Sequence, residues 1–330
     1  MKEATIDLWA KEIIKKTGFV LDKEIQRGYY YTSDKVRSIN FGGKYKNKPA
    51  ILKVYDDPRL TSEPMDLIAF NKQNKSKVLK APAVYDYKMI SAKRGWLIME
   101  KIPANARCFV RPINPKTRKE ITDLYLEYRK NFPTKPTRKL TLAENLSARD
   151  FHVFRINRWL QLANDKEAER MLEKKKPILN SKEFIPCFEK GMDLIRKEFK
   201  NRKMVWCHGH FNPAEIFKNP KDNTYYLLDF AHTKMYPEGY ELAFIIWSDW
   251  ITNADRRKPY VEWKKGIKEW VAEIGRIAGK LKIKNFQSLM RASLVERCLG
   301  TILADICATD KPEKEQRKRI DLIYGFLDEV

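Results

Sequence analysis

A short segment in the second half of the chain gathers the residue types that catalysis uses most often. It runs from Val205 to Phe217 and contains His208 and His210, and Asp229 follows at the end of the next apolar strand. His232 lies just beyond, so three of the four histidines of the protein fall here. An imidazole can accept a proton near neutral pH, and a carboxylate can bind a hard cation. A polar loop on a hairpin, followed by an acid at a strand end, commonly positions a catalytic group and a metal ligand.

The same histidines allow a different chemistry. His208 and His210 stand two residues apart, so on an extended segment their side chains share one face. Together with Asp229 and His232 they could bind Zn²⁺ or another transition metal. The segment does not offer a closed set of ligands, so a transition-metal site remains an alternative.

The elements that must position this segment change in character along the chain. Residues 1–16 mix charged and apolar residues at helical spacing, and the following part up to Pro103 has the pattern of strands and turns around one helix, Glu63–Gln73. Helical patterns dominate from residue 104 to 330, apart from a strand-rich island over Met204–Phe230. This order predicts an α+β fold with two lobes: a small antiparallel-sheet lobe over 1–103 and a larger, mostly helical lobe over 104–330.

Alternation and helical periodicity give the individual elements. The predicted strands of the first lobe are Phe19–Ile25, Val36–Tyr45, Pro49–Tyr55, Val84–Ile90 and Trp96–Ile102. The predicted helices of the second lobe are Ile121–Tyr128, Phe151–Leu162, Phe184–Phe199, Trp263–Ile277 and Phe286–Ile306. The polar turn Lys46–Lys48 is expected to join the second and third strands as a hairpin.

Composition narrows the class of protein. The 330 residues are 43% hydrophobic, which is enough for a large core or for two lobes. No apolar run approaches the roughly 18 residues of a membrane-spanning helix, and residues 1–16 lack the apolar core of a signal peptide. The five cysteines are scattered and odd in number, which is typical of reduced thiols. We therefore expect a cytoplasmic protein without a membrane segment.

The net charge of +23 is the strongest compositional feature. Such a field attracts nucleotides, phosphorylated metabolites or nucleic acid, and it argues against a strongly cationic substrate. No RNA- or DNA-binding motif is evident, so the expected affinity for polyanions is non-specific. A neutral or anionic small molecule is the favoured substrate.

The island resembles the catalytic loop of aminoglycoside phosphotransferases and choline kinases. In that family the loop reads His-Gly-Asp, then Asn after four intervening residues, then two apolar residues, and a later apolar strand ends in Asp-Phe or Asp-Trp. The matching parts of this chain are His208–Gly209, Ile216–Phe217, Leu227–Phe230 and the later Tyr240–Ala243. The resemblance implies a protein-kinase-like fold with its catalytic and metal-binding loop over residues 205–232, and ATP and Mg²⁺ as cofactors.

The first lobe agrees with this resemblance. Ala50–Val54 resembles the strand whose lysine holds the nucleotide phosphates, which assigns that role to Lys53 and makes Glu63 its expected ion-pair partner. Trp96–Glu100 resembles the strand that leads into the hinge, so Glu100 is a further candidate for cofactor binding.

The weakest match is the turn Arg27–Ser33, where the family cradles phosphate. It contains one glycine and three tyrosines, so it is not a glycine-rich loop. Backbone N–H groups near Gly28 and Ser33 could still contact phosphate.

Two substitutions depart from the family pattern. His210 stands at the position of the catalytic Asp, and Glu215 stands at the position of the metal-binding Asn. With Asp229 and Glu215 as metal ligands the site keeps two carboxylates, and a neutral His210 could accept the proton of a hydroxyl. The sequence therefore predicts an ATP- and Mg²⁺-dependent phosphotransferase acting on a hydroxyl of a small molecule. The alternative is a catalytically impaired, pseudokinase-like module that binds nucleotide or regulates a partner.

Overall fold

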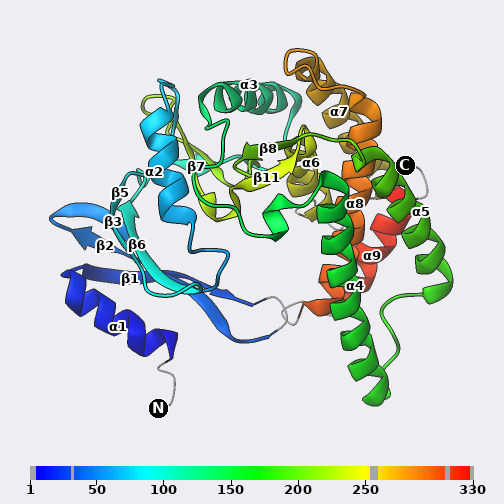
Figure 1. The fold of residues 1–330 in the computed structure, drawn as a ribbon, viewed down its shortest axis with the longest axis horizontal. Helices are drawn as coiled ribbons and strands as arrows, with labels where there is room; N and C mark the ends of the chain where they lie inside the picture. The colour runs from blue at the N-terminus through cyan, green and yellow to red at the C-terminus, as the bar shows by residue number, and fades with distance from the viewer. Residues whose placement is uncertain (1–4, 31–32, 253–258, 309–312, 328–330) are drawn as a thin grey trace. The chain divides into compact units, whose positions relative to one another are not determined.

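The computed structural model describes residues 5–30, 33–252, 259–308 and 313–327 (Figure 1). The chain divides into two compact units, each made of segments that are far apart in the sequence. The first unit comprises Met1–Cys108, Lys130–Arg138 and Glu215–Thr233. The second comprises Phe109–Arg129, Lys139–Ala214 and Lys234–Val330. The island predicted over residues 204–230 is thus divided between the two units.

A five-stranded antiparallel sheet forms the centre of the first unit, in the order β1-β2-β3-β6-β5. Its strands are β1 (Val20–Tyr29), β2 (Val36–Tyr45), β3 (Lys48–Asp56), β5 (Val84–Met89) and β6 (Arg94–Glu100). Helix α1 (Ile6–Thr17) packs on one face, where Ala10 and Ile13 meet alternate residues of the strands such as Ile39 and Val54 (Figure 1). This alternation arises because successive strand side chains point to opposite faces.

The other face of the sheet carries helix α2 (Glu63–Gln73), which contacts β5. A four-stranded sheet in the order β4-β10-β9-β7 completes the first unit. Its strands are β4 (Leu79–Lys80), β7 (Arg107–Cys108), β9 (Ile216–Lys218) and β10 (Tyr225–Leu227). The rings of Phe70, Phe132 and Phe230 pack together with centroids 5.3 to 6.4 Å apart, and thereby join α2 to the segment after β10.

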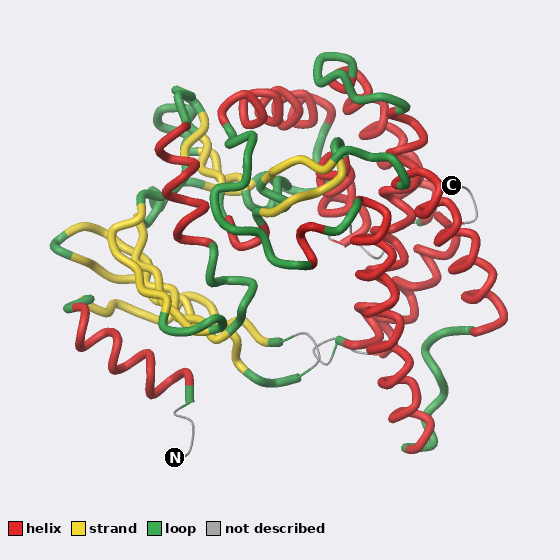
Figure 2. The backbone as a smooth tube through the Cα atoms, in the orientation of Figure 1, coloured by secondary structure: helices red, strands yellow, loops and turns green. Residues whose placement is uncertain are grey.

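Helices make up most of the second unit. They are α3 (Pro115–Asn131, whose last two residues belong to the first unit), α4 (Ala148–Leu172), α5 (Ser181–Phe199), α6 (Tyr240–Ile246), α7 (Tyr260–Ala278), α8 (Phe286–Cys307) and α9 (Glu313–Leu327). Helix α8 is buried over most of its surface because α4, α5, α6 and α9 all pack against it. Figure 2 shows α4, α5 and α8 running beside one another. Strands β8 (Met204–Cys207) and β11 (Lys234–Pro237) form a two-stranded sheet, and β8 leads directly into the loop that begins at His208.

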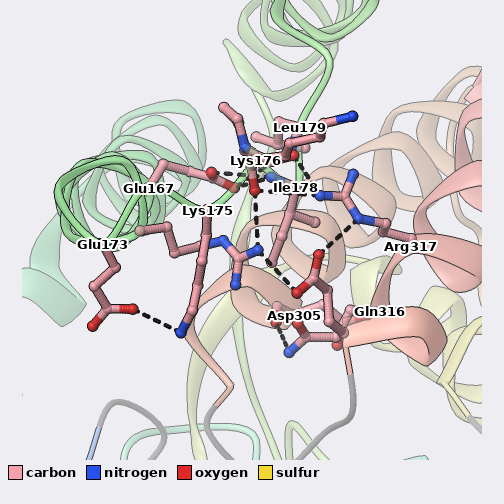
Figure 3. A network of polar contacts seen from close by, with 12 residues as sticks. Glu167, Glu173, Lys175, Lys176, Ile178, Leu179, Asp305, Gln316 and Arg317 are labelled. Atoms are coloured by element: carbon pink, nitrogen blue, oxygen red, sulfur yellow. Dashed lines mark hydrogen bonds and ion pairs between the residues drawn. The ribbon is translucent and has the colours of Figure 1, made fainter.

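Polar contacts fix the connection between α4 and α5, which passes beside α9 (Figure 3). The guanidinium of Arg317 donates to the carbonyl of Pro177 at 2.7 Å, and the carboxylate of Glu167 accepts from the backbone N–H of Ile178 at 2.9 Å. Gln316 donates to the carbonyl of Asp305 at 2.7 Å, which links α9 to the end of α8. Buried backbone groups at helix ends are costly when unpaired, so Gln316 stabilises the end of α8, whereas Arg317 and Glu167 bind the connection itself.

Most predicted elements are present, and the differences have physical causes. Helix α2 has the predicted bounds, and the turn at Lys46 and Asn47 has the positive φ angles of a tight hairpin. Helix α4 runs ten residues further than expected because eight residues of its extension are strong helix formers: two Ala, two Glu, and one each of Lys, Arg, Met and Leu. Strand β11 and helix α9 were not predicted, since one is only four residues long and the other is highly charged.

The strands of the island pair differently from the predicted hairpin around one polar loop. Strand β8 before the loop pairs with β11, whereas β9 after it pairs with β10. The loop therefore connects two sheets. Among the described residues no helix is both long and apolar enough to span a bilayer. All five cysteines are free thiols.

Candidate functional site

Lys53 and Glu63 form a buried ion pair in the first unit. Lys53 lies on β3 and its Nζ atom is 2.5 Å from Oε2 of Glu63, at the start of α2. Burial lowers the pKa of Lys53, but the carboxylates of Glu63 and Asp229 outweigh this effect and raise it. The ion pair expected from the sequence is therefore present, and Lys53 is held as an ammonium ion. Its predicted contact with a nucleotide stays a prediction.

Asp229 belongs to the same unit although 176 positions separate it from Lys53. It follows β10 in the left-handed backbone conformation, with φ 60° and ψ 60°, which few residues other than glycine adopt. Its side chain is half-buried, and Oδ2 is 3.6 Å from Nε2 of His232. The charge of Asp229 also contributes to raising the pKa of Glu63, after the larger effect of burial. Lys53, Glu63 and Asp229 thus act on one another electrostatically within one unit.

Glu215 stands next to Asp229 across the hairpin formed by β9 and β10. Ile216 pairs with Leu227, and the backbone N–H of Leu228 donates to the carbonyl of Glu215 at 2.9 Å. Glu215 and Asp229 therefore lie at the same end of the hairpin, and both are half-buried. Two carboxylates at one hairpin end form a donor set that suits Mg²⁺, which prefers oxygen ligands.

The other predicted cofactor-binding residues have structural contacts of their own. A Cβ atom at Gly28 would lie 2.8 Å from Oγ of Ser38, so glycine lets β1 approach β2 closely. Ser33 is exposed, and its hydroxyl accepts from the backbone N–H of Lys35 at 3.4 Å. Tyr31 and Thr32 of the same turn lie outside the described residues.

Glu100 ends β6 and joins it to the preceding segment. It accepts from the backbone N–H of Ala83 at 3.1 Å through Oε2, and its own N–H donates to the carbonyl of Ala83 at 2.8 Å. These contacts shape the end of the sheet. The roles of Gly28, Ser33 and Glu100 toward a nucleotide stay predictions.

Sequence reasoning missed a second charged group in the first unit. Asp57, just after β3, is completely buried and accepts from Nη2 of Arg59 at 2.6 Å and from the Arg59 backbone N–H at 2.9 Å. Nη1 of Arg37 is 3.7 Å from the same carboxylate. The hydrogen bond from Arg59, its backbone N–H and the positive charges hold the pKa of Asp57 below its usual range against the opposing effect of burial. An acid at a strand end with Arg two residues later was the available signal.

In the second unit the loop after β8 is held by its backbone. The phenol of Tyr128 accepts from the N–H of His208 at 2.7 Å, and Oε1 of Glu241 accepts from the N–H of Gly209 at 2.6 Å. Arg129 donates to the carbonyl of Trp206 at 3.1 Å. Helices α3 and α6 therefore hold the end of β8 and the first two residues of the loop. Glu241 is the acidic residue of the motif Tyr240–Ala243.

Glu241 is buried, and burial raises the pKa of its carboxyl. Arg129 and the donors around Glu241, which include the N–H of Gly209 and the hydroxyls of Tyr125 and Tyr128 at 3.3 Å, oppose that shift. A set of donors around one carboxylate favours the ionised form, which can only accept. Glu241 is thus suited to hold the loop in one conformation.

His210 lies in the second unit, on the surface of α6. Its ring packs on Phe244 with the centroids 4.5 Å apart, and its backbone N–H donates to Nδ1 of the His208 ring at 3.2 Å. Its carbonyl accepts from the side chain of Asn212 at 2.8 Å, and Asn212 in turn accepts from Ser248 at 3.0 Å. The buried His208 accordingly supports the loop. Proton transfer by His210 and the transition-metal alternative stay predictions.

Comparisons with known proteins give a consistent picture. Residues 41–276 match the family model described as the phosphotransferase enzyme family. A search of curated proteins finds no match. Three of the similar solved structures cover nearly the whole chain and share its fold.

The first of these three is a thermostable variant of the aminoglycoside phosphotransferase APH(4)-Ia in a ternary complex with ADP and hygromycin B. It is 14% identical with a TM-score of 0.58, and the alignment covers 96% of this chain and 97% of that one. The ethanolamine kinase of Plasmodium vivax is 13% identical with a TM-score of 0.58, over 98% and 90% of the two chains. Spectinomycin phosphotransferase APH(9)-Ia in complex with ADP and spectinomycin is 12% identical with a TM-score of 0.56, over 98% of both. The predicted α+β, protein-kinase-like fold is thereby confirmed.

Proposed function

Because the chain belongs to the phosphotransferase enzyme family, we propose that it transfers the terminal phosphoryl group of Mg²⁺-bound ATP to a hydroxyl of a small molecule. The observation that carries this proposal is the assembly of Lys53, Glu63 and Asp229 within one unit, from segments far apart in the sequence. Phosphoryl transfer depends on positioned charges more than on covalent chemistry, and this group provides them. The ADP bound in two of the similar structures supports an adenine nucleotide.

Each charged residue has a distinct role in this proposal. Lys53 would bind phosphate oxygens, with Glu63 holding its ammonium in place. Asp229 and Glu215 would bind Mg²⁺, which when bound neutralises charge on the phosphates. Glu100 would contact the nucleotide at the end of β6, and backbone N–H groups near Gly28 and Ser33 would contact phosphate.

His210 would accept the proton of the acceptor hydroxyl in place of the usual aspartate. A neutral imidazole can take up a proton near pH 7, although it cannot add the negative charge of a carboxylate. The contacts of the loop backbone with Tyr128, Arg129 and Glu241 would keep the imidazole in position, because they restrict the main chain on its N-terminal side. The net charge of +23 favours a neutral or anionic acceptor.

ATP consumption across a panel of hydroxylated metabolites tests this function. We expect the wild-type protein to consume ATP with at least one acceptor, and the variant Asp229→Ala to lose at least about a hundredfold in rate. The matched control is Asp222→Ala, which changes an exposed acid of the same hairpin. Equal rates for wild type and Asp229→Ala would contradict the proposal.

A pseudokinase-like module is the second candidate, and His210 at the position of the catalytic aspartate is the observation that favours it. It predicts that the protein binds Mg²⁺-nucleotide without turnover. A nucleotide at a hundred times its dissociation constant should stabilise the fold by about 2.7 kcal/mol in a thermal-shift experiment. Turnover by the wild-type protein would exclude this candidate. Stabilisation without turnover, together with activity gained in the double variant His210→Asp and Glu215→Asn, would establish it.

A further inference from the structure

One buried carboxylate in the first unit holds two arginines. Asp57 is completely buried just beyond β3. The guanidinium of Arg59 donates two hydrogen bonds to its carboxylate, from Nε at 3.0 Å and from Nη2 at 2.6 Å. Arg37, at the start of β2, brings Nη1 to 3.7 Å from Asp57, which is an ion pair without a hydrogen bond. The carboxylate therefore fixes both guanidinium groups in one place.

The charges in this group do not balance. One carboxylate faces two guanidinium ions, and the Arg37 and Arg59 side chains are 33% and 51% exposed, so one positive charge of this group remains accessible to an anion. Within the part of the chain that the structure describes, Nε of Arg37 is buried and has no hydrogen-bond partner. Burial lowers the pKa of Arg37, and the nearby charge of Arg59 lowers it further. An additional anion would relieve both effects.

The two arginines are close enough to the proposed phosphate site to interact with it electrostatically. The charge of Asp229 acts on Arg37 and on Arg59, and the charge of Arg37 acts in turn on Lys53. Nε of Arg37 would be only 3.4 Å from a Cβ atom at Gly28, which belongs to the predicted phosphate-binding turn Arg27–Ser33, although the first three residues of that turn are the end of β1. That turn contains a single glycine, so it offers few of the flexible backbone amides that usually bind phosphate.

We propose that Arg37 and Arg59, bridged by Asp57, form a phosphoryl-binding site that replaces a glycine-rich loop. Asp57 occupies Nε and Nη2 of Arg59, which leaves Nη1 to donate to a phosphate oxygen. Guanidinium groups match phosphate geometry and stay charged when partly buried. The phosphate belongs either to the nucleotide or to a phosphorylated acceptor, and the inference rests on the proposed function for the identity of that ligand.

Calorimetric titration tests the site with inorganic tripolyphosphate, Mg²⁺-ATP, AMP and inorganic phosphate as probes. The variants are Arg37→Gln, whose guanidinium makes no hydrogen bond to Asp57, and the double change Asp57→Asn with Arg59→Gln, which removes the buried acid with its partner. The control is Arg94→Gln, since Arg94 pairs with the neighbouring Asp56. We expect each test variant to weaken tripolyphosphate binding about tenfold or more, and the control to change it less than twofold.

The probes separate the two sources of phosphate. If the nucleotide supplies it, affinity for Mg²⁺-ATP falls with that for tripolyphosphate, and binding of AMP changes less. If a phosphorylated acceptor supplies it, binding of inorganic phosphate falls and that of Mg²⁺-ATP is kept. Test variants that bind every probe like the wild type overturn the phosphoryl site.

Failure of this inference can be told apart from failure of the proposed function. If the wild-type protein binds Mg²⁺-ATP and the variants bind it and the other probes equally well, the proposed function is retained and the arginine site is rejected. If the wild-type protein binds tripolyphosphate but no nucleotide, and the arginine variants bind tripolyphosphate less tightly, the site is supported and the proposed function is rejected. Circular dichroism of each variant confirms that the fold is intact before binding is compared.

Discussion

The two units use charged residues in different ways. In the first unit the charged side chains themselves form the candidate site, because Lys53, Glu63 and Asp229 interact with one another. In the second unit Glu241 and Arg129 bind backbone groups of the loop. The candidate site of the first unit thus depends on the identity of each charged side chain. In the second unit the charged side chains serve to hold the main chain of the loop in place.

This difference explains how a segment can match a family and still change its reactive residue. The loop before His210 is held through the N–H groups of His208 and Gly209 and the carbonyl of Trp206. Main-chain contacts do not depend on the side chain at position 210. A histidine can therefore occupy that position without disturbing the loop, whereas replacement of Lys53 would leave a buried carboxylate unpaired.

The largest expected effect concerns the ion pair of the first unit. The variant Lys53→Ala leaves the buried Glu63 without its ammonium partner, which should lower the free energy of unfolding by about 3–5 kcal/mol. The double variant Lys53→Met with Glu63→Leu removes both charges and should recover most of that stability. Activity should be lost in both variants, since neither can bind phosphate through Lys53. Urea unfolding and ATP consumption measure the two properties separately.

The matched control for this experiment is the exposed pair of Lys119 and Asp123 in the second unit. Its atoms are 2.9 Å apart, but both side chains are largely exposed, so Lys119→Ala should cost less than about 0.5 kcal/mol. If Lys53→Ala is no more destabilising than Lys119→Ala, the ion pair of Lys53 and Glu63 does not contribute to stability as a buried pair should.

Acid should affect the surroundings of His152 in α4 and those of Asp66 in α2 in opposite directions, which is the second prediction. In the second unit, burial of His152 lowers its pKa from 6.5 to about 4, so the unfolded chain binds the proton more readily. Stability is therefore lost as the pH falls from 6.5 to 4, by about 3 kcal/mol in total. The neighbouring Glu296 adds to this loss at lower pH. Burial favours its neutral form, but the charges of Arg155 and His152 outweigh this effect and lower the pKa.

In the first unit, burial raises the pKa of Asp66 from 3.8 to about 6, against the effects of Thr137 and Arg138. Here the folded state binds the proton more readily, so stability is gained as the pH falls from 6 to 3.8, again by about 3 kcal/mol. Amide hydrogen exchange resolved by residue should show lower protection in α4 and α8 and higher protection in α2 at pH 4. His152→Gln should abolish only the first change, and Asp66→Asn only the second. A change of the same sign in α4 and α2 would contradict the assignment.

The third prediction concerns the reactive residue. If His210 is a less effective general base than the usual aspartate because it lacks the negative charge of a carboxylate, the double variant His210→Asp with Glu215→Asn should raise turnover by roughly 10–100-fold. His210→Asn, which removes the imidazole, should lower it by a similar factor. The free energy of unfolding should change by less than about 1 kcal/mol in each case, since the loop is held by its backbone. Steady-state kinetics of the three proteins on one acceptor provide the measurement.

The sequence predicts the first unit better than the second. The strands β2 and β3 and helix α2 can be read from local alternation, turn residues and periodicity, and these are also the elements that carry Lys53 and Glu63. The pairing of β8 with β11 depends on 26 intervening residues that form another sheet, and no local pattern encodes such a contact. Long-range pairing is therefore where the interpretation of the island as a single hairpin was wrong.

The candidate site shows the same limit. Lys53, Glu63 and Asp229 could be identified because each matches a family motif at a fixed place in an element. Arg37, Asp57 and Arg59 match no motif. Asp57 and Arg59 are only two residues apart, but the link of Arg37 to them appears only when β2 and the segment after β3 lie side by side. Tyr128 was likewise assigned only to a helical stripe, although its hydroxyl binds the loop.

The smallest expected effect tests the backbone-holding role of Glu241. In Glu241→Gln an amide oxygen can still accept from Gly209, but a charge-assisted hydrogen bond becomes a neutral one, which should cost about 1–2 kcal/mol of unfolding free energy. Because the change affects only the loop of the second unit, kcat should fall several-fold while the KM for nucleotide stays constant. Tyr125→Phe, which removes a single 3.3 Å contact to the same carboxylate, serves as the milder control. If the KM for nucleotide rises as much as kcat falls, the loop of the second unit also contributes to nucleotide binding, and the assignment of binding to the first unit is wrong.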